Sequence, residues 1–278
     1  MTVFKSKYLK DKTFTTKEEL FNELRLNKDL IIDAKKSEIY KSVDKDQSVE
    51  VRSVDLIKFT DQSKAFNVDP NYYYFVVNST KILDSHEDLH VDGLWNKSVK
   101  EIAGKNYFVE DHNLEISKVI ARKEHIEIFT AKVPFSVIGK KYPGETEVLV
   151  YKIAKAKIKN QDIKEWLDSG DAIECSVRMR YITVELAMDS NAPQDKTYKK
   201  TYDTYIDQIA NKKDFDYISH FFVIKEAQNV RESSLVVFGS NSSTGVVESK
   251  TDQPSNDTDK SKPEPSNDTQ KKRALLIN

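Results

Sequence analysis

Cysteine, glycine and long apolar runs are all scarce in this sequence of 278 residues. Its single cysteine, Cys175, excludes an intramolecular disulfide and fits a reducing compartment. With only 7 glycines, the sequence contains neither a Walker A loop nor a dinucleotide-binding fingerprint. The longest apolar run, Tyr72–Val77, is far too short to span a bilayer. We therefore expect a soluble protein without a bound cofactor.

An excess of charge of one sign is also lacking, because 44 basic residues face 45 acidic ones and the net charge is -1. The balance does not predict a surface for nucleic acid or for an anionic membrane. The opening stretch, MTVFKSKYLKDK, lacks the apolar core of a signal peptide. These features predict a cytoplasmic protein with neither a nucleic-acid nor a membrane partner.

The first of three regions, residues 1–69, is expected to be a helical N-terminal extension. Thr16 and Glu19 have the spacing of a capping box. Apolar residues then recur at helical spacing, at Leu20, Phe21 and Leu24. This pattern predicts a helix near residues 16–27, and a weaker pattern predicts another near 34–43.

The second region, residues 70–242, has the pattern of a strand-rich domain. β-Branched and aromatic residues alternate with polar ones in five segments: 72–77, 119–133, 147–158, 172–187, and a run that begins at 221–222 and resumes at 234–238. Helices are expected at 162–168 and 201–211. Many strands with few helices predict a mainly β, α+β domain built as a barrel or sandwich.

The third region, residues 243–278, consists mostly of Ser, Thr, Asn, Asp, Lys and Pro, and the sequence PSNDT occurs in it twice. Such a segment cannot bury enough apolar surface to offset the entropy lost on ordering, so we expect a disordered tail. Only residues 274–277 are apolar, and they would suit docking on a partner.

The sequence HEDLH, from His86 to His90, has the spacing with which a helix presents two histidines to zinc and a Glu as general base. Asp88 stands where such helices carry an uncharged core residue, and Asn96 stands where the extended motif has a third ligand. The preceding segment, NSTKILDS, is polar and turn-forming. We therefore favour a polar turn with solvated histidines and keep a zinc hydrolase built on His86 and His90 as the third alternative.

The segment 172–187 carries the most informative pattern. Strand alternation places apolar residues on one face, at Ile173, Cys175, Val177, Met179 and Tyr181. Ser176, Arg178 and Arg180 share the other face, until Ile182, Val184 and Leu186 take it over. A serine flanked by guanidinium groups suits acyl transfer, in which fixed donors stabilise the developing oxyanion. The same pattern also fits a half-exposed strand whose Ser and Arg face solvent.

A serine nucleophile needs a base, and the sequence offers five histidines: His86, His90, His112, His125 and His220. His112 lies between an apolar approach and an apolar strand, at the end of a scaffold element where a side chain can be both held and exposed. Composition alone does not select among the five.

Four motifs follow one another between residues 84 and 241. DSHEDLHVDGLWNKSV begins at Asp84, YFVEDH ends at His112, WLDSGDAIECSVRMRY includes Gly170 and Ser176, and RESSLVVFGSN carries Glu232. In this order they resemble the signatures of the caudovirus prohead proteases, which share the fold of the herpesvirus assemblins. The resemblance covers about residues 70–242.

This resemblance implies a closed or partly open β-barrel of the herpesvirus-protease type and a serine endopeptidase. Ser176 would be the nucleophile, His112 its base and Glu232 the acidic member, with His220 as the alternative third member. Arg178, Arg180 or nearby backbone amides would stabilise the oxyanion.

The sequence departs from the family pattern at three places: Glu87 replaces a Gly, Leu94-Trp95 replaces Ala-Phe, and Val177-Arg178 replaces Ile-Gly after the nucleophile. Only the third departure touches the site, and it leaves the oxyanion donors open. Compared with the family, residues 188–219 also look like an insertion, which would contain the helix expected at 201–211.

The family context further implies that the enzyme acts in the bacterial host cytoplasm, inside the immature phage head. Its substrates would be the major capsid protein, the scaffold protein and the enzyme itself, with possible self-association. The N-terminal extension and the tail would then be candidates for removal. The alternative is a catalytically inactive protein of the protease fold, acting as a scaffold or minor head component.

Overall fold

The computed structural model describes residues 4–9, 12–37, 57–58, 68–169, 174–237 and 245–248. Its strands are β1 Ile57–Lys58, β2 Tyr72–Ser79, β3 Asp88–His90, β4 Tyr107–Glu110, β5 Val119–Ala121, β6 Ile126–Pro134, β7 Glu145–Ala154, β8 Glu174–Met188, β9 His220–Val236 and β10 Gly245–Glu248. Its α-helices are α1 Lys17–Ser37, α2 Ser98–Ile102, α3 Gln161–Ser169 and α4 Lys196–Tyr205. Short 3₁₀ turns are η1 Lys7–Leu9, η2 Ile116–Lys118, η3 Lys123–His125, η4 Phe135–Ile138, η5 Lys155–Lys157, η6 Pro193–Asp195, η7 Ile206–Gln208 and η8 Lys212–Asp214.

One sheet has the strand order β1-β10-β2-β7-β6. Its central strands β2 and β7 run antiparallel and are buried on both faces. On β2, Tyr73 and Phe75 belong to the main hydrophobic core, whereas Tyr74 and Val76 belong to a second core on the opposite face. Two-sided burial explains why this segment is a continuous apolar run in the sequence.

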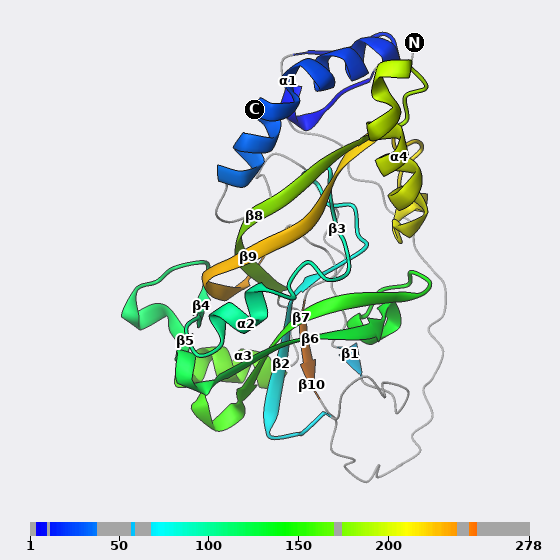
Figure 1. Ribbon diagram of the computed structural model, residues 1–278. Coiled ribbons are helices and arrows are strands. Elements are labelled where there is room, and N and C mark those ends of the chain that lie inside the picture. The colour runs from blue at the N-terminus through cyan, green and yellow to red at the C-terminus, as the bar shows by residue number, and fades with distance from the viewer. Residues whose placement is uncertain are drawn as a thin grey trace, which may run out of the picture.

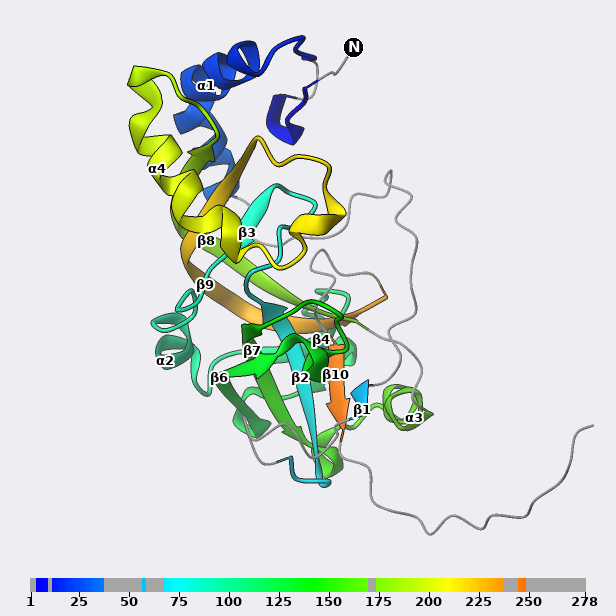
Figure 2. The same cartoon turned by 90° about the vertical axis from the view of Figure 1, so that its right-hand side faces the viewer.

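The other sheet is organised around β9, which pairs antiparallel with β8 along nearly its whole length. On its other edge, β9 pairs in parallel first with β3 and then with β4. Figure 1 shows β8 and β9 running together between two ends of the molecule, with α1 and α4 at one end and β4, β5 and α2 at the other. The view in Figure 2 shows the same separation.

Strand β8 changes the face that it presents to the core partway along its length. Cys175, Val177, Met179 and Tyr181 lie in the main core, but so do Val184 and Leu186, which have the opposite parity. The register between β8 and β9 shifts on both sides of Thr183, and a bulge at this point turns the following side chains to the other face. The expected change of apolar face is therefore confirmed for Val184 and Leu186, whereas Ile182 is exposed.

The described residues form a mixed α+β, strand-rich fold, as expected, but their sheets do not close into a barrel. The expected break in the last strand is wrong, because β9 is continuous from His220 to Val236. We expected disorder from residue 243, whereas Gly245–Glu248 form β10 against β2; the rest of the tail lies outside the described residues. No helix in the described ranges is long and apolar enough to cross a membrane.

Helix α1 begins at the predicted place and continues ten residues further than expected, to Ser37. The capping box forms, because Glu19 N–H donates to Thr16 Oγ1 at 3.2 Å and Thr16 N–H donates to Glu19 Oε2 at 3.3 Å. The start of the predicted 34–43 helix is thus the end of α1, and residues 38–43 lie outside the described part. Helix α3 matches its prediction, and α4 begins five residues earlier than expected, at Lys196.

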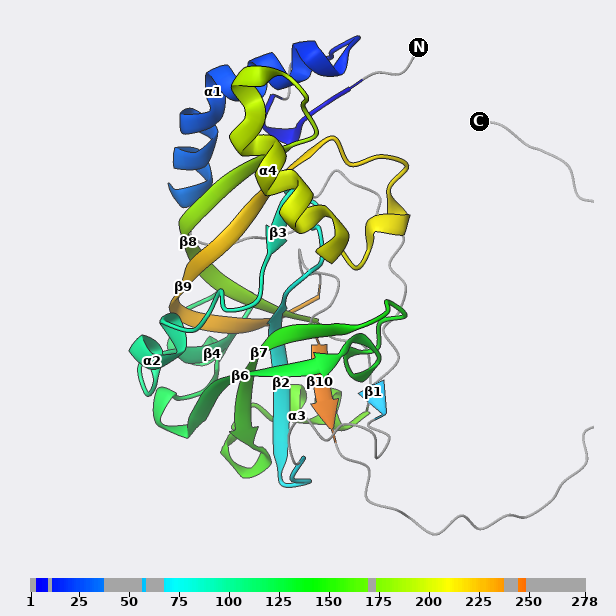
Figure 3. The ribbon, with the colours of Figure 1, turned by 45° about the vertical axis from the view of Figure 1, so that its right-hand side comes forward.

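The described part of the N-terminal extension is built into the core. Five apolar side chains pack into the main hydrophobic cluster with the sheets: Phe14, Leu20, Phe21, Leu24 and Ile31. Figure 3 shows α1 lying beside α4 at the end of β8 and β9. This segment is therefore an integral layer of the fold.

A fully buried ion pair joins α1 to β3. The ammonium of Lys35 contacts a carboxylate oxygen of Asp88, and both side chains have no exposed surface. Lys35 also donates to the carbonyl oxygen of His86 at 3.0 Å and lies over the rings of Tyr8 and Phe222. The second Asp88 oxygen accepts the Tyr181 hydroxyl at 2.9 Å. Removing one partner of such a buried ion pair strongly destabilises a fold, because the remaining charge stays buried without its counterion.

Replacing Lys35 by methionine is expected to destabilise the fold by about 3–5 kcal/mol, because the Asp88 carboxylate loses its buried counterion. The measurement is the urea midpoint of unfolding, compared with that of Lys36→Met at the neighbouring, partly exposed position. Equal midpoints for the two variants would contradict the role given to the buried pair.

Glu87 forms a second connection to the N-terminal segment. Its carboxylate accepts the Ser6 hydroxyl at 2.8 Å and the Lys7 backbone N–H at 2.9 Å, and lies 3.2 Å from His220 Nε2. Burial raises the pKa of Glu87, but His220 and the two N-terminal donors outweigh this effect, so its pKa lies below the ordinary 4.5.

Because the folded pKa of Glu87 is depressed, its carboxylate contributes stability above about pH 4.5 that is lost as the pH falls through the folded value. We expect Glu87→Gln to be less stable than the wild type near neutral pH and to lose less stability on acidification. Urea unfolding of both proteins from about pH 7 to pH 3 measures the difference. Parallel pH profiles would refute this assignment.

Candidate active site

Three neighbouring strands place a serine, a histidine and a glutamate together. Ser176 lies near the start of β8 and is the cross-strand partner of Ser234 on β9. Glu232 lies on β9 two residues before Ser234, hence on the same side of the strand. His112 follows directly after β4, whose last residues pair with Ser234 and Leu235. The sheet therefore unites groups separated by 64 and 120 positions in the chain.

The three side chains form one hydrogen-bonded series. His112 Nδ1 lies 2.9 Å from Glu232 Oε1, and His112 Nε2 lies 2.9 Å from Ser176 Oγ. When the Glu232 carboxylate is ionised it only accepts hydrogen bonds, and Nδ1 then carries the proton between the two groups. In the neutral imidazole, Nε2 is then unprotonated and accepts the Ser176 hydroxyl proton. This is the arrangement of nucleophile, base and orienting acid that activates a serine.

The three side chains differ in burial, and Glu232 is the most deeply buried. The Glu232 side chain has no exposed surface, Ser176 is 7% exposed and the His112 side chain is 12% exposed. Water therefore competes little for the carboxylate, which strengthens its interaction with the imidazole. His112 is the most exposed of the three side chains, and Ser176 is largely buried.

The turn that carries His112 has an uncommon backbone. Asp111 and His112 adopt φ values of 45° and 57°, in the left-handed region that costs L-residues roughly 1–2 kcal/mol each. Asp111 N–H donates to Leu235 O at 2.9 Å, and Asn113 N–H donates to Glu110 O at 2.8 Å. Such strain persists where surrounding contacts impose it, and it concentrates at functional sites. The turn ends β4 abruptly and directs the imidazole toward β8.

Strand β9 has its own irregularity around the acid. The register passes from Val177↔Ser233 to Met179↔Asn229, so β9 contains two more residues than β8 over this stretch. Arg231 has a φ of 67° within the extra segment. Bulges of this kind re-aim side chains next to active sites, and Glu232 lies within this irregular stretch.

Cys175 is excluded as the nucleophile, as strand alternation predicted. It is 1% exposed and packs in the main core, on the face opposite Ser176. Burial raises the pKa of its thiol well above the ordinary value, so the reactive thiolate is suppressed.

The two arginines differ in their surroundings. Arg180 is exposed, and its Nη2 donates to Oε1 of its cross-strand partner Gln228 at 2.7 Å. Arg178 is half-buried and its Nε is enclosed by protein. Arg178 lies two positions after Ser176 in β8 and Arg180 lies four, so Arg178 is the nearer of the two along the strand.

His220 is not the third member of the site. It begins β9, at the opposite end of the strand from Glu232, and its Nε2 faces Glu87 at 3.2 Å. Its Nδ1 lies 3.0 Å from Ser219 Oγ. The structure assigns the position next to His112 Nδ1 to Glu232, so the alternative based on His220 is wrong.

The HEDLH segment does not form the helix that a zinc site of this spacing requires, because Asp88–His90 is strand β3. His90 is 3% exposed, with Nε2 2.9 Å from the Tyr181 hydroxyl and Nδ1 3.0 Å from Asn78 Nδ2. Among the described residues, no group of three or more His, Cys, Asp or Glu is arranged to hold a metal ion. The expected solvated turn is also wrong, since His86 is only 7% exposed.

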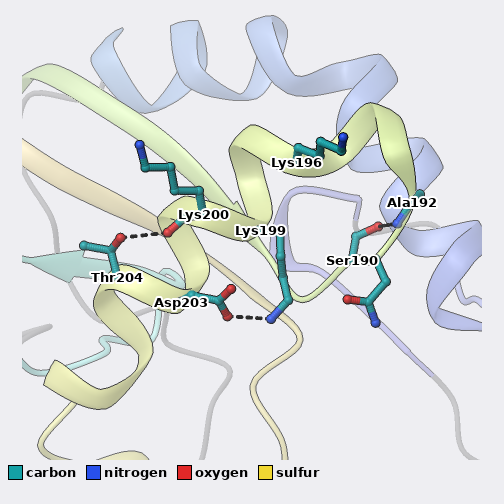
Figure 4. A pocket seen from close by; sticks show the side chains of 8 residues that line it. Ser190, Ala192, Lys196, Lys199, Lys200, Asp203 and Thr204 are labelled. Atoms are coloured by element: carbon teal, nitrogen blue, oxygen red, sulfur yellow. Dashed lines mark hydrogen bonds and ion pairs between the residues drawn. The ribbon is translucent and has the colours of Figure 1, made fainter.

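A surface pocket lies elsewhere, along α4 and the segment before it (Figure 4). Its lining includes Lys196, Lys199 and Lys200, and the Lys199 ammonium pairs with Asp189 and Asp203. Helix α4 packs near the far end of β8, so this pocket includes no member of the Ser–His–Glu series.

Comparison with protein-family models, with curated proteins and with solved structures found no match for this chain. The functional assignment therefore depends on the geometry of the site itself. Two contributions to that geometry were missed from the sequence: the left-handed pair at Asp111 and His112, and the hydroxyl of Ser234, which contacts the His112 backbone at 2.9 Å.

The Ser176 hydroxyl is expected to react selectively with diisopropyl fluorophosphate, because His112 removes its proton as it attacks. Peptide mass spectrometry locates the adduct. His112→Ala should slow labelling by about 10²–10⁴-fold, while Ser136→Ala, at an exposed serine, serves as the matched control and should leave it unchanged. An adduct at another serine, or none, would refute an activated Ser176.

Proposed function

We propose that this protein is a serine endopeptidase in which Ser176, His112 and Glu232 form the catalytic triad. The observation that carries the proposal is the pair of 2.9 Å contacts that join His112 to both partners through its two ring nitrogens. The contacts bring together residues from three separate chain segments, and the carboxylate at one end is fully buried.

In the proposed reaction, Ser176 Oγ attacks the carbonyl carbon of a peptide bond and His112 Nε2 takes the hydroxyl proton. Glu232 keeps the imidazole in the required tautomer and stabilises its cation. The C–N bond then breaks, His112 gives the proton to the leaving amine, and an acyl-enzyme forms. Water, activated by the same imidazole, attacks the ester and releases the acid product and free Ser176.

We further propose a role in phage head maturation, inside the immature head in the bacterial cytoplasm. The order of the motifs around Asp84, His112, Ser176 and Glu232 supports this role, because it resembles that of the prohead proteases. The major capsid protein and the scaffold protein would be the substrates.

Self-processing at the N-terminus is more restricted than the sequence suggests. Residues 12–37 supply core side chains and the Lys35–Asp88 pair, so their loss would expose apolar surface and leave a buried carboxylate without its counterion. A mature enzyme would therefore keep this segment.

Co-expression with the cognate capsid and scaffold proteins is expected to yield shortened substrate chains. Ser176→Ala should abolish cleavage, and Glu232→Gln should slow it by about 10³–10⁴-fold, because the amide favours the wrong imidazole tautomer. The readout is the mass of the substrate chains, with Ser136→Ala as the matched control. If wild type and Ser176→Ala leave both substrates equally intact, the endopeptidase proposal fails, and the alternative of a catalytically inactive scaffold or minor head protein is favoured.

A further inference from the structure

We propose that Ser234 is a positioning residue that holds the catalytic base by its backbone. The inference rests on the proposed function, since it assigns a task within the same site. Ser234 Oγ accepts the backbone N–H of His112 at 2.9 Å and donates to Leu235 O at 3.0 Å. It belongs to no reacting pair, so it acts only through His112.

The position of Ser234 in the sheet brings it near the strands that carry all three members of the site. It pairs with Ser176 on β8 and with Val109 on β4, and it follows Glu232 by two residues. It is fully buried. One side chain thus lies between the strand of the nucleophile and the turn of the base, on the same side as the acid.

The hydroxyl of Ser234 completes the support of a strained turn. Asp111 N–H is held by Leu235 O, and the same carbonyl oxygen accepts the Ser234 hydroxyl. The hydroxyl in turn accepts the His112 N–H, so three consecutive groups are linked across β4 and β9. Without it, the His112 N–H loses its acceptor and the left-handed conformation loses one of its restraints. The imidazole would then move relative to both Ser176 and Glu232.

Ser233 supplies a matched comparison within the same strand. It is equally buried, and its Oγ accepts a hydrogen bond from Asn229 Nδ2 at 3.0 Å. Its side chain points to the other face of β9, away from Ser234. Ser233 also forms a hydrogen bond with the buried Tyr151 hydroxyl, so removing either serine hydroxyl disturbs buried hydrogen bonds, but of the two only Ser234 contacts His112.

The test compares Ser234→Ala, Ser234→Thr and Ser233→Ala with the wild type. Hydrolysis of p-nitrophenyl acetate gives kcat and KM, and the rate of diisopropyl fluorophosphate labelling reports on Ser176 directly. We expect Ser234→Ala to lower kcat and labelling about 10–100-fold with KM within about twofold, because a small misplacement of a catalytic group has this effect. Ser234→Thr keeps the hydroxyl and should restore at least a third of the wild-type kcat, and Ser233→Ala should stay within about threefold of the wild type.

Two further measurements separate positioning from general damage. Urea unfolding should show similar losses of stability in Ser234→Ala and Ser233→Ala. Amide hydrogen exchange should become faster at His112 only in Ser234→Ala, since that amide loses its acceptor. Equal kcat in Ser234→Ala and the wild type, or equal losses in both alanine variants, would overturn the inference. A wild-type protein that reacts with neither reagent would instead overturn the proposed function, while exchange at His112 still tests the contact.

Discussion

The antiparallel pairing of β8 with β9 is the constraint on which the rest of the structure depends. It sets the nucleophile opposite Ser234, carries the core side chains of both strands, and provides the edge on which β3 and β4 align. Its bulges are as informative as its regular parts. The bulge near Thr183 returns apolar side chains of β8 to the core. The irregular stretch of β9 between Asn229 and Ser233 contains Glu232. The site is therefore a consequence of register rather than of any local motif.

Register also explains how much could be predicted from the sequence. Strand alternation separated Ser176 from Cys175 correctly, because that choice depends only on which face a side chain occupies. The capping box at Thr16 and the helix at Gln161–Ser169 followed from local patterns as well. The choice of His112 and Glu232 needed the motif order, since no periodicity relates residues 120 positions apart.

Two features could not be predicted from the sequence: the backbone conformation at His112 and the burial of a charged side chain. The left-handed backbone conformation of Asp111 and His112 could not be recognised from the residue types, since neither residue is glycine. The charged appearance of the first residues suggested a separable extension, whereas Lys35 is buried against Asp88. Charged residues are rarely buried unless they are paired, and the partner here is 53 positions away. Local sequence patterns therefore predict which residues are exposed better than they predict a buried ion pair between distant residues.

The spacing of the site along the chain has a consequence for the time at which it forms. His112 and Ser176 are synthesised well before Glu232 and Ser234, so an emerging chain lacks the acid and the restraint on the base until synthesis has passed β9. Contacts between such distant residues also form slowly in folding. The three groups can therefore come together only after nearly all of the described fold has been made, so an incomplete chain would lack the activity proposed for this site.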